Sequence, residues 1–324
     1  MDKVFLRYTP LTASSVTIKD LMPHAFGWGG GDARVFHETR HGLNIFRLQP
    51  FENTVRNHWN MRKNTIDSLV LHFTASTFGS TINTFTNASP HNDRTSAHYV
   101  ITEREVHTVT HETVVEPGLI FHVVPDDQAA WHVGKPAAAW GMQVGGWNHN
   151  TLGIECVGHG FFQDIEQKLA LIHLINGLVQ TYNIPSHRIY GHGDLDSSRS
   201  DPGVFCPWNL LAEQSLGAWL DDEDLDLPYI KRHHQDFPGA KASREERSQF
   251  FHYHLKKFGY HLNMQSLSLE GFFASGNGNR EKVISFYAHF SCNQNPQALA
   301  ERRVSEPTDY DLLWAWGLAL KYGH

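Results

Sequence analysis

The chain has 324 residues, of which 40% are hydrophobic and 19% are charged, and its formal net charge is −7. This composition is typical of globular proteins, and the absence of any run of Lys and Arg argues against a nucleic-acid partner. The N-terminal stretch MDKVFLRYTPLTASS has no apolar region of signal-peptide length. The longest apolar stretch, Leu169–Val179, is too short to cross a bilayer. We therefore expect a soluble protein without a transmembrane segment, cytoplasmic as the sequence stands and periplasmic or in the cell envelope if a leader was removed.

Cysteine is rare in this chain, whereas histidine is abundant. Cys156, Cys206 and Cys292 form no CxxC pair, which argues against a disulfide framework and against a thiolate zinc knuckle. The 23 histidines exceed ordinary usage several-fold, and histidine is the commonest metal ligand. A metal site in this protein is therefore expected to use imidazole ligands.

Residues 1–60 are aromatic, polar and irregular in pattern, and we expect them to form an extension packed on the domain that follows. The glycine-rich patch Gly27–Asp32 lacks both the preceding strand and the following Gly-Lys-Ser/Thr of a phosphate-binding loop. We interpret it as an ordinary loop.

Strand and helix patterns alternate over residues 61–220, which predicts an α/β domain whose sheet is covered by helices. The strand-like runs lie at residues 68–74, 97–103, 119–124, 151–157 and 188–192. An amphipathic helix separates the last two runs, with Asp164 and Gln167 predicted to form a capping-box variant and Pro185 after its end. Its apolar positions are Ile165, Leu169, Ile172, Ile175, Leu178 and Val179.

The last hundred or so residues change in character. Residues 221–242 contain DDEDLDLPYI and DFPGAKAS and are predicted to be an acidic linker. Residues 243–324 show purely helical periodicity and predict a small three-helix domain. Its first helix opens with a capping box of Ser243 and Glu246 and ends at Gly259. Phe250, Phe251, Leu255 and Phe258 share one face of that helix.

Two histidines stand at the ends of predicted strands. His72 ends LVLH and His192 ends IYGH, so both imidazoles can reach the same edge of one sheet. Zinc in catalytic sites takes three protein ligands and leaves one position open. The candidates for a third ligand are Asp194, Asp196, Asp201 and Cys206. A Pro-Gly turn after Asp201 favours that carboxylate, whereas Asp194 and Asp196 are equally well explained as solvated turn residues.

One carboxylate and one cation complete the candidate chemistry. Leu152, Ile154 and Cys156 share one face of their strand, which leaves Glu155 on the opposite face. Glu155 is either an exposed edge residue or a general base for an activated water. Arg199 either hydrogen-bonds a developing oxyanion or is a solvated loop residue.

The motifs LVLHFTAS, SAHYVITE, AAWHVG, NHNTLGIECVG and GHGDLDSSRSDPGVFCPW follow in this order over residues 68–208. Together they resemble the zinc-dependent N-acetylmuramoyl-L-alanine amidases of type 2, a family that includes phage lysozyme-type amidases and peptidoglycan recognition proteins. The resemblance implies a mixed central sheet flanked by helices. It also implies zinc-dependent hydrolysis of the amide bond between the lactyl group of N-acetylmuramic acid and L-alanine in peptidoglycan or muropeptides.

The resemblance also implies roles for individual residues. His72, His192 and Asp201 take the zinc-ligand positions, and Glu155 takes the catalytic carboxylate position with Arg199 as its partner in catalysis. Substrate-binding positions fall on Trp131, His132, Asn150 and His98. The loop from His192 to Asp201 is one residue shorter than is usual in the bacterial enzymes, and Arg199 stands where those enzymes typically have Lys. Arginine stays charged and so cannot donate a proton.

Two alternatives remain open at this point: a non-catalytic peptidoglycan-binding receptor of the same fold, and a zinc amide hydrolase with a substrate outside the cell wall. The C-terminal helices are similar to small peptidoglycan-binding domains. We therefore expect deletion from about Asp221 onward to preserve cleavage of small muropeptides and to weaken action on intact sacculi. The sequence does not decide between anhydro and ordinary muramoyl substrates, and it indicates neither the stem peptide nor the oligomeric state.

Overall fold

The computed structural model describes residues 16–17, 22, 34–49, 58–86, 95–134, 139–140, 142, 146–231, 237–239, 241–262, 279–290, 296–301 and 306–323. The glycine-rich patch Gly27–Asp32 and Cys292 lie outside the described residues. Within the described residues, no helix is both long and apolar enough to span a bilayer.

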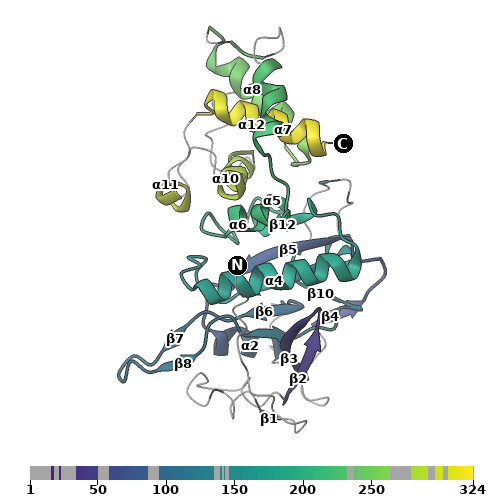
Figure 1. Ribbon diagram of the computed structural model, residues 1–324, viewed down its shortest axis with the longest axis vertical. Helices are drawn as coiled ribbons and strands as arrows, with labels where there is room; N and C mark the ends of the chain where they lie inside the picture. Colours follow the sequence, from purple (N-terminus) through teal and green to yellow (C-terminus); the bar gives the residue numbers. More distant parts are fainter. Residues whose placement is uncertain are drawn as a thin grey trace.

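An eight-stranded mixed sheet forms the centre of the molecule, in the order β1-β2-β3-β9-β6-β11-β5-β12 (Figure 1). Its strands are β1 Val16–Thr17, β2 Arg34–Arg40, β3 Leu43–Gln49, β5 Ser68–Phe73, β6 Tyr99–Ile101, β9 Ile120–His122, β11 Thr151–Cys156 and β12 Ile189–Gly191. The neighbours β6, β11, β5 and β12 run parallel, whereas β9 is antiparallel to β6. The predicted α/β fold with a mixed sheet is confirmed, and five of its strands lie where the sequence placed them.

The N-terminal region contributes strands that the sequence reading missed. Strands β2 and β3 form a hairpin, and β3 pairs in parallel with β9, so this hairpin extends the central sheet. The sequence pattern of residues 34–49 indicated no strand, whereas the structure has two strands there. Neither segment has the strict alternation by which a half-buried strand is recognised. In β2 only Val35 is buried, and in β3 the adjacent residues Ile45 and Phe46 are both buried.

Helix α4, Ile165–Tyr182, covers one face of the sheet (Figure 1). Leu152, Ile154 and Cys156 of β11 face it and belong to the core that it covers. The face of α4 differs from the prediction, because Ile165 and Leu169 are 52% and 37% exposed. The residues buried along α4 are Gln167, Ala170, Leu171, Leu174, Ile175, Gly177 and Leu178.

The capping box predicted for α4 does not form. Asp164 is the N-cap residue but makes no side-chain capping bond, and its carboxylate accepts from the backbone N–H of Arg104 at 2.7 Å. Gln167 is buried, and its side chain donates to the carbonyls of Ile101 and Val157. Both side chains therefore bond to groups outside the helix, and the local bonds of a capping box are not made.

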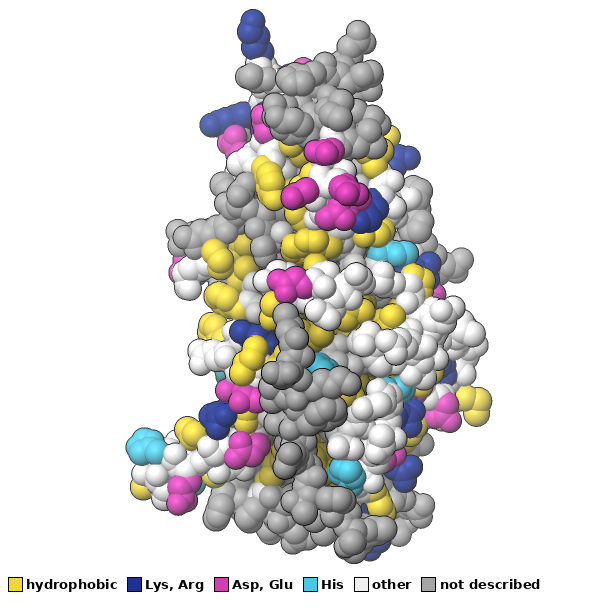
Figure 2. Space-filling view, viewed as in Figure 1, with side chains coloured by type: hydrophobic (Ala, Val, Ile, Leu, Met, Phe, Trp, Pro, Cys, Tyr) yellow, Lys and Arg dark blue, Asp and Glu magenta, His cyan; other side chains and the backbone are white. Residues whose placement is uncertain are grey.

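The opposite face of the sheet is covered partly by helix α2, Phe78–Thr86, and partly by the C-terminal helices. Helix α2 packs there against Val100 and Phe121. Further strands and helices connect the sheet elements, namely β4 Trp59–Met61, β7 Glu105–Val106, β8 Thr113–Val115, β10 Gln128–Ala130, α3 Trp147–Asn150, α5 His192–Leu195 and α6 Trp208–Glu213. Strands β7 and β8 form a hairpin that projects from the body of the protein (Figures 1 and 2).

The C-terminal region is helical, as predicted. Its helices are α7 Asp222–Lys231, α8 Arg244–Phe258, α10 Asn279–Phe290, α11 Pro296–Ala300 and α12 Asp309–Tyr322. Both bonds of the Ser243–Glu246 capping box are present, and the N–H of Gly259 caps α8 at Leu255. Part of the predicted linker is wrong, because residues 222–231 form α7. Acidic side chains gather where α7 lies (Figure 2), and Asp224 pairs with Lys321 of α12.

The C-terminal helices share a core with the sheet. Val70 of β5 and Tyr190 of β12 point to the face opposite α4, where they join a cluster with Phe251 and Phe286 of the helices. Tyr190 also lies 5.0 Å from the ring of Trp140, centroid to centroid. The two regions are therefore packed together over one hydrophobic core.

Candidate metal centre and active site

Three parallel strands bring the candidate site together at one edge of the sheet. Strands β5, β11 and β12 lie side by side, with Glu155 in register with His72 and Gly191 in register with Leu71. His192 follows Gly191 directly and begins α5. The prediction that His72 and His192 meet at one edge is confirmed: their ring centroids are 4.6 Å apart.

Asp201 joins the two histidines. Its Oδ2 lies 2.8 Å from Nδ1 of His72 and 3.1 Å from Nδ1 of His192. Ligand atoms of these three residues all lie within 4.8 Å of one another, and both histidines are buried. Two imidazole nitrogens and a carboxylate oxygen, converging in this way, fit a divalent transition metal with one coordination position left for another group.

The other ligand candidates point elsewhere. Asp194 faces the C-terminal helices, where Tyr260 and His289 bond its carboxylate. Asp196 closes a local turn by accepting from Ser198. Cys206 is a buried free cysteine in the core beneath α4, and burial raises the pKa of its thiol well above the usual value. Of the candidates for a third ligand, only Asp201 lies with the two histidines.

Burial and hydrogen bonding set the protonation of the ligands in the metal-free protein. Burial lowers the pKa of His72 to about 4, and its bond to Asp201 only partly opposes this shift. Burial by itself would raise the pKa of Asp201, but the bonds from His192 and His72 outweigh it and lower that pKa. Neutral imidazole and ionised carboxylate are the forms that bind metals.

Glu155 is partly buried on the face of β11 that was predicted for it. Burial, reinforced by the negative charge of Asp201, raises the pKa of Glu155 to about 8, against the opposing charge of Arg199. Its Oε2 is enclosed and has no hydrogen-bond partner among the residues that the structure describes. An acid with a raised pKa and a free oxygen, placed beside metal ligands, is suited to proton transfer.

Arg199 lies on the exposed part of the loop between His192 and Asp201. Its positive charge acts on both His72 and Glu155. It adds to the lowering of the pKa of His72, and it opposes part of the rise in the pKa of Glu155. The guanidinium is therefore near the site and is accessible from solvent.

His132 lies behind His72 and is 5% exposed. Its Nδ1 is 3.0 Å from Nε2 of His72, and its Nε2 is 3.0 Å from Oγ1 of Thr151. The Thr151 hydroxyl donates in turn to the carbonyl of Trp147 at 2.7 Å. If Nδ1 of His72 binds a metal, its Nε2–H donates to His132, and every hydrogen in this chain then has an acceptor.

Gly153 makes room for this arrangement. A Cβ at Gly153 would lie 2.6 Å from Cγ and Nδ1 of His132. A glycine inside a strand is a signal that another group approaches closely, although it does not indicate that the group is His132.

His98 is fully buried, and its ring centroid lies 5.6 Å from that of His132. Its Nδ1 accepts from the N–H of Gly153 at 2.9 Å, so its Nε2–H is the donor to the carbonyl of Gln128 at 3.1 Å. Both ring nitrogens of His98 are therefore engaged within the protein, and the side chain has no exposed surface in this structure.

The two remaining candidates for substrate binding lie in different places. Asn150 precedes β11 at its start and bonds Asn64, and the strand carries Glu155 roughly 16 Å away at about 3.3 Å per residue. The structure therefore does not bring Asn150 to the site. Trp131 is partly exposed beside His132, and its ring is parallel to that of His58.

The fold and the site together define an α/β protein with a candidate His-His-Asp metal centre at the carboxyl ends of three parallel strands. Residues 62–204 match the family of N-acetylmuramoyl-L-alanine amidases. This segment contains all three candidate ligands and Glu155, so the residues of the site lie within the part of the chain that is similar to that amidase family.

Individual proteins resemble this chain in sequence and in fold. The N-acetylmuramoyl-L-alanine amidase AmiD of Escherichia coli (strain K12) is 27% identical over 254 residues, which are 73% of this chain and 81% of the relative. The solved complex of E. coli AmiD with the substrate anhydro-N-acetylmuramic acid-L-Ala-D-γ-Glu-L-Lys has a TM-score of 0.58 at 23% identity, covering 80% of this chain and 90% of that one. AmpDh3 from Pseudomonas aeruginosa has a TM-score of 0.59 at 22% identity, covering 85% and 99%. At these identities the two structures show a shared fold.

Proposed function

We propose that this protein is a zinc amidase that cleaves the bond between the lactyl carbonyl of N-acetylmuramic acid and the amino group of L-alanine. The observation that carries the proposal is the convergence of His72, His192 and Asp201 beside Glu155. All four residues lie within the segment that matches the amidase family. Zinc is the metal proposed because it accepts this mixture of nitrogen and oxygen ligands and leaves a position open in catalytic sites.

The proposed substrate is a muropeptide with an anhydro-muramoyl end. The solved structure of E. coli AmiD contains such a substrate, and one structure of AmpDh3 contains an anhydromuramic pentapeptide. Both have the fold of this chain, which supports a similar ligand here. Trp131, partly exposed beside the site, is proposed to line the cleft for the sugar or the peptide.

The reaction is an amide hydrolysis in which one proton is moved twice. A zinc ion held by His72, His192 and Asp201 would polarise the scissile carbonyl and acidify the attacking water. The carboxylate of Glu155 accepts a proton from that water while the water oxygen forms a bond to the carbonyl carbon. The same carboxylic acid then returns the proton to the leaving nitrogen of L-alanine as the C–N bond breaks.

Arg199 is proposed to stabilise the charge that develops on the carbonyl oxygen. Its position near Glu155 and its exposure allow it to meet a substrate that enters from solvent. Arginine can donate hydrogen bonds to an oxyanion but keeps its own protons, so proton transfer remains with Glu155.

The decisive experiment is an assay of the purified full chain on defined muropeptides, with and without a chelator, read by product mass. We expect free stem peptide and intact muramoyl sugar, activity that is lost on chelation, and recovery on addition of Zn²⁺. Stoichiometric zinc with no cleaved product would favour a binding receptor instead. Cleavage of other amides but not of muropeptides would favour a different substrate.

A further inference from the structure

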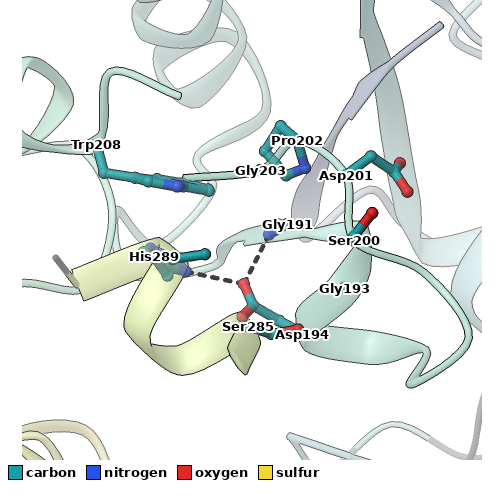
Figure 3. A pocket seen from close by; sticks show the side chains of 11 residues that line it. Gly191, Gly193, Asp194, Ser200, Asp201, Pro202, Gly203, Trp208, Ser285 and His289 are labelled. Carbon is teal, nitrogen blue, oxygen red and sulfur yellow. Dashed lines mark hydrogen bonds and ion pairs between the residues drawn. The ribbon is translucent and has the colours of Figure 1, made fainter. Parts of the chain in front are cut away.

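The loop that presents two of the three candidate ligands is bound directly to the C-terminal helices. His192 begins this loop and Asp201 ends it, and the N–H of Gly193 donates to the carbonyl of Asp201 at 2.9 Å. Asp194 lies between the two ligands in sequence and is 3% exposed. Its side chain points away from the metal site, towards α10 (Figure 3).

Asp194 accepts bonds from three separate parts of the chain. Its Oδ2 accepts from the N–H of Gly191 at 2.8 Å and from Nδ1 of His289 at 2.8 Å (Figure 3). Its Oδ1 accepts from the hydroxyl of Tyr260 at 2.6 Å. Because a carboxylate only accepts hydrogen bonds, His289 is the donor through Nδ1. One buried side chain thus connects the end of β12 to α10 and to Tyr260, the second residue after α8.

A second contact reaches the backbone of the same loop. Lys282 of α10 is 3% exposed, and its Nζ donates to the carbonyl of Asp194 at 2.9 Å and to that of Gly193 at 3.4 Å. A Cβ at Gly193 would lie 2.8 Å from Oγ of Ser285, so α10 approaches the loop backbone to van der Waals distance.

His289 is itself held in place by an aromatic neighbour. Its ring stacks on the indole of Trp208 with centroids 3.6 Å apart and planes at 18° (Figure 3). Both rings are buried, with exposed fractions of 5% and 3%. The donor that reaches Asp194 is therefore fixed in orientation.

We propose that Tyr260 and His289 are positioning residues of the metal centre, which act through Asp194 to hold the loop that presents His192 and Asp201. The C-terminal helices then serve as a structural part of the hydrolytic site, whatever affinity they have for glycan. This inference rests on the proposed metal site. Metal ligands on a loop need such support, because partners behind the ligands fix their orientation and commonly affect metal affinity about 10–100-fold.

The test compares variants of the full chain that differ in single hydrogen bonds. Tyr260→Phe removes only the hydroxyl group, which donates a hydrogen bond to Asp194. His289→Leu removes the second donor, whereas His289→Asn keeps a donor in the place of Nδ1. Arg247→Ala is the matched control, because it breaks a C-terminal contact, the pair with Asp309, that does not involve the loop.

Zinc affinity is measured by competition with a chelating dye, and the absorption spectrum of the Co²⁺-loaded protein reports ligand geometry. We expect Tyr260→Phe and His289→Leu to weaken zinc binding about tenfold or more and to alter the Co²⁺ spectrum, and His289→Asn to recover most of the affinity. We expect kcat to fall more than KM rises, because substrate contacts are unchanged. Arg247→Ala should bind zinc as the wild type does.

Two results would overturn the inference. One is a wild-type zinc affinity and a wild-type Co²⁺ spectrum in both Tyr260→Phe and His289→Leu. Even if their melting temperatures fell, this result would show that the contacts are structural only. The other is a wild-type chain that binds no zinc, which would remove the proposed function as well and is therefore distinguishable from the first.

Discussion

Nε2 of His72 lies 3.0 Å from Nδ1 of His132, and this pair connects the candidate metal centre to the interior of the sheet. With Nδ1 of His72 directed at Asp201, the second nitrogen of the same ring is directed at His132. His132 is 5% exposed and contacts the ring of a candidate ligand instead of facing solvent. This position differs from the substrate-binding position expected from the sequence.

Replacing His132 by Ala should weaken zinc binding about 10–100-fold, because Nε2–H of His72 loses its acceptor. Competition with a chelating dye measures the change. His132→Asn, which keeps an acceptor near the position of Nδ1, should recover part of the affinity. His173→Ala, on the exposed side of α4, is the control and should bind as the wild type does; equal affinity in His132→Ala would show that the contact is unimportant for the metal.

Substitution of Glu155 by Gln should leave zinc content unchanged and lower kcat by about 10²–10⁴-fold, which is the usual contribution of a general acid–base group. The amide has nearly the shape of the carboxylic acid but cannot accept the proton of the attacking water. Metal analysis and turnover on a defined muropeptide are measured on the same preparation. Near-normal turnover in this variant would contradict the role given to Glu155.

The raised pKa of Glu155 also predicts a pH dependence of stability for the metal-free protein. The unfolded carboxyl ionises near its ordinary pKa of 4.5, whereas the folded one keeps its proton up to about pH 8. Between these values the unfolded state binds fewer protons, so the free energy of unfolding falls as pH rises. Other groups, such as His72 with its lowered pKa, titrate in the same range in both proteins. Denaturant unfolding from pH 4.5 to 8 should therefore show the free energy of unfolding of the wild type falling relative to that of Glu155→Gln. Parallel curves for the two proteins would count against the shift.

Gly153→Ala should destabilise the protein by about 1–3 kcal/mol, the usual cost of overpacking a core. The new Cβ would lie 2.6 Å from the His132 ring, so the ring must move and its bond to His72 is disturbed. Zinc affinity should therefore fall as well. Gly239→Ala, where no atom lies within 4 Å of the added Cβ, is the matched control, and a Gly153→Ala protein indistinguishable from it would refute the packing argument.

Removal of the chain from about Asp221 onward should abolish activity on small muropeptides as well as on intact sacculi. The structure reverses the expectation from the sequence, because Val70 and Tyr190 of the sheet are buried against Phe251 and Phe286. Their exposure to water would cost several kcal/mol, about 1.5–3 for each large apolar side chain. Melting temperature and soluble yield test this together with activity. A truncated chain that is stable, monomeric and fully active on small fragments would disprove it.

The sequence by itself determined the elements that depend on local patterns. Apolar strand runs that end in His72 and His192 placed two imidazoles at one edge, because neighbouring parallel strands end together. The alternation in TLGIECV placed Glu155 on the face away from α4. The capping box of Ser243 and Glu246 also followed from local spacing, since both of its bonds lie within one helical turn.

Tertiary structure decided whatever depends on contacts between distant segments. The carboxylate of Asp164 bonds Arg104 instead of capping its own helix, and His132 turns inward because Gly153 leaves it room. Most clearly, Asp194 was a candidate for the third ligand and was otherwise explained as a solvated turn residue, yet it is buried and faces Tyr260 and His289. Which of two neighbouring carboxylates meets the metal ligands is set by packing between segments far apart in the chain, and a pattern read along the chain contains no such distances.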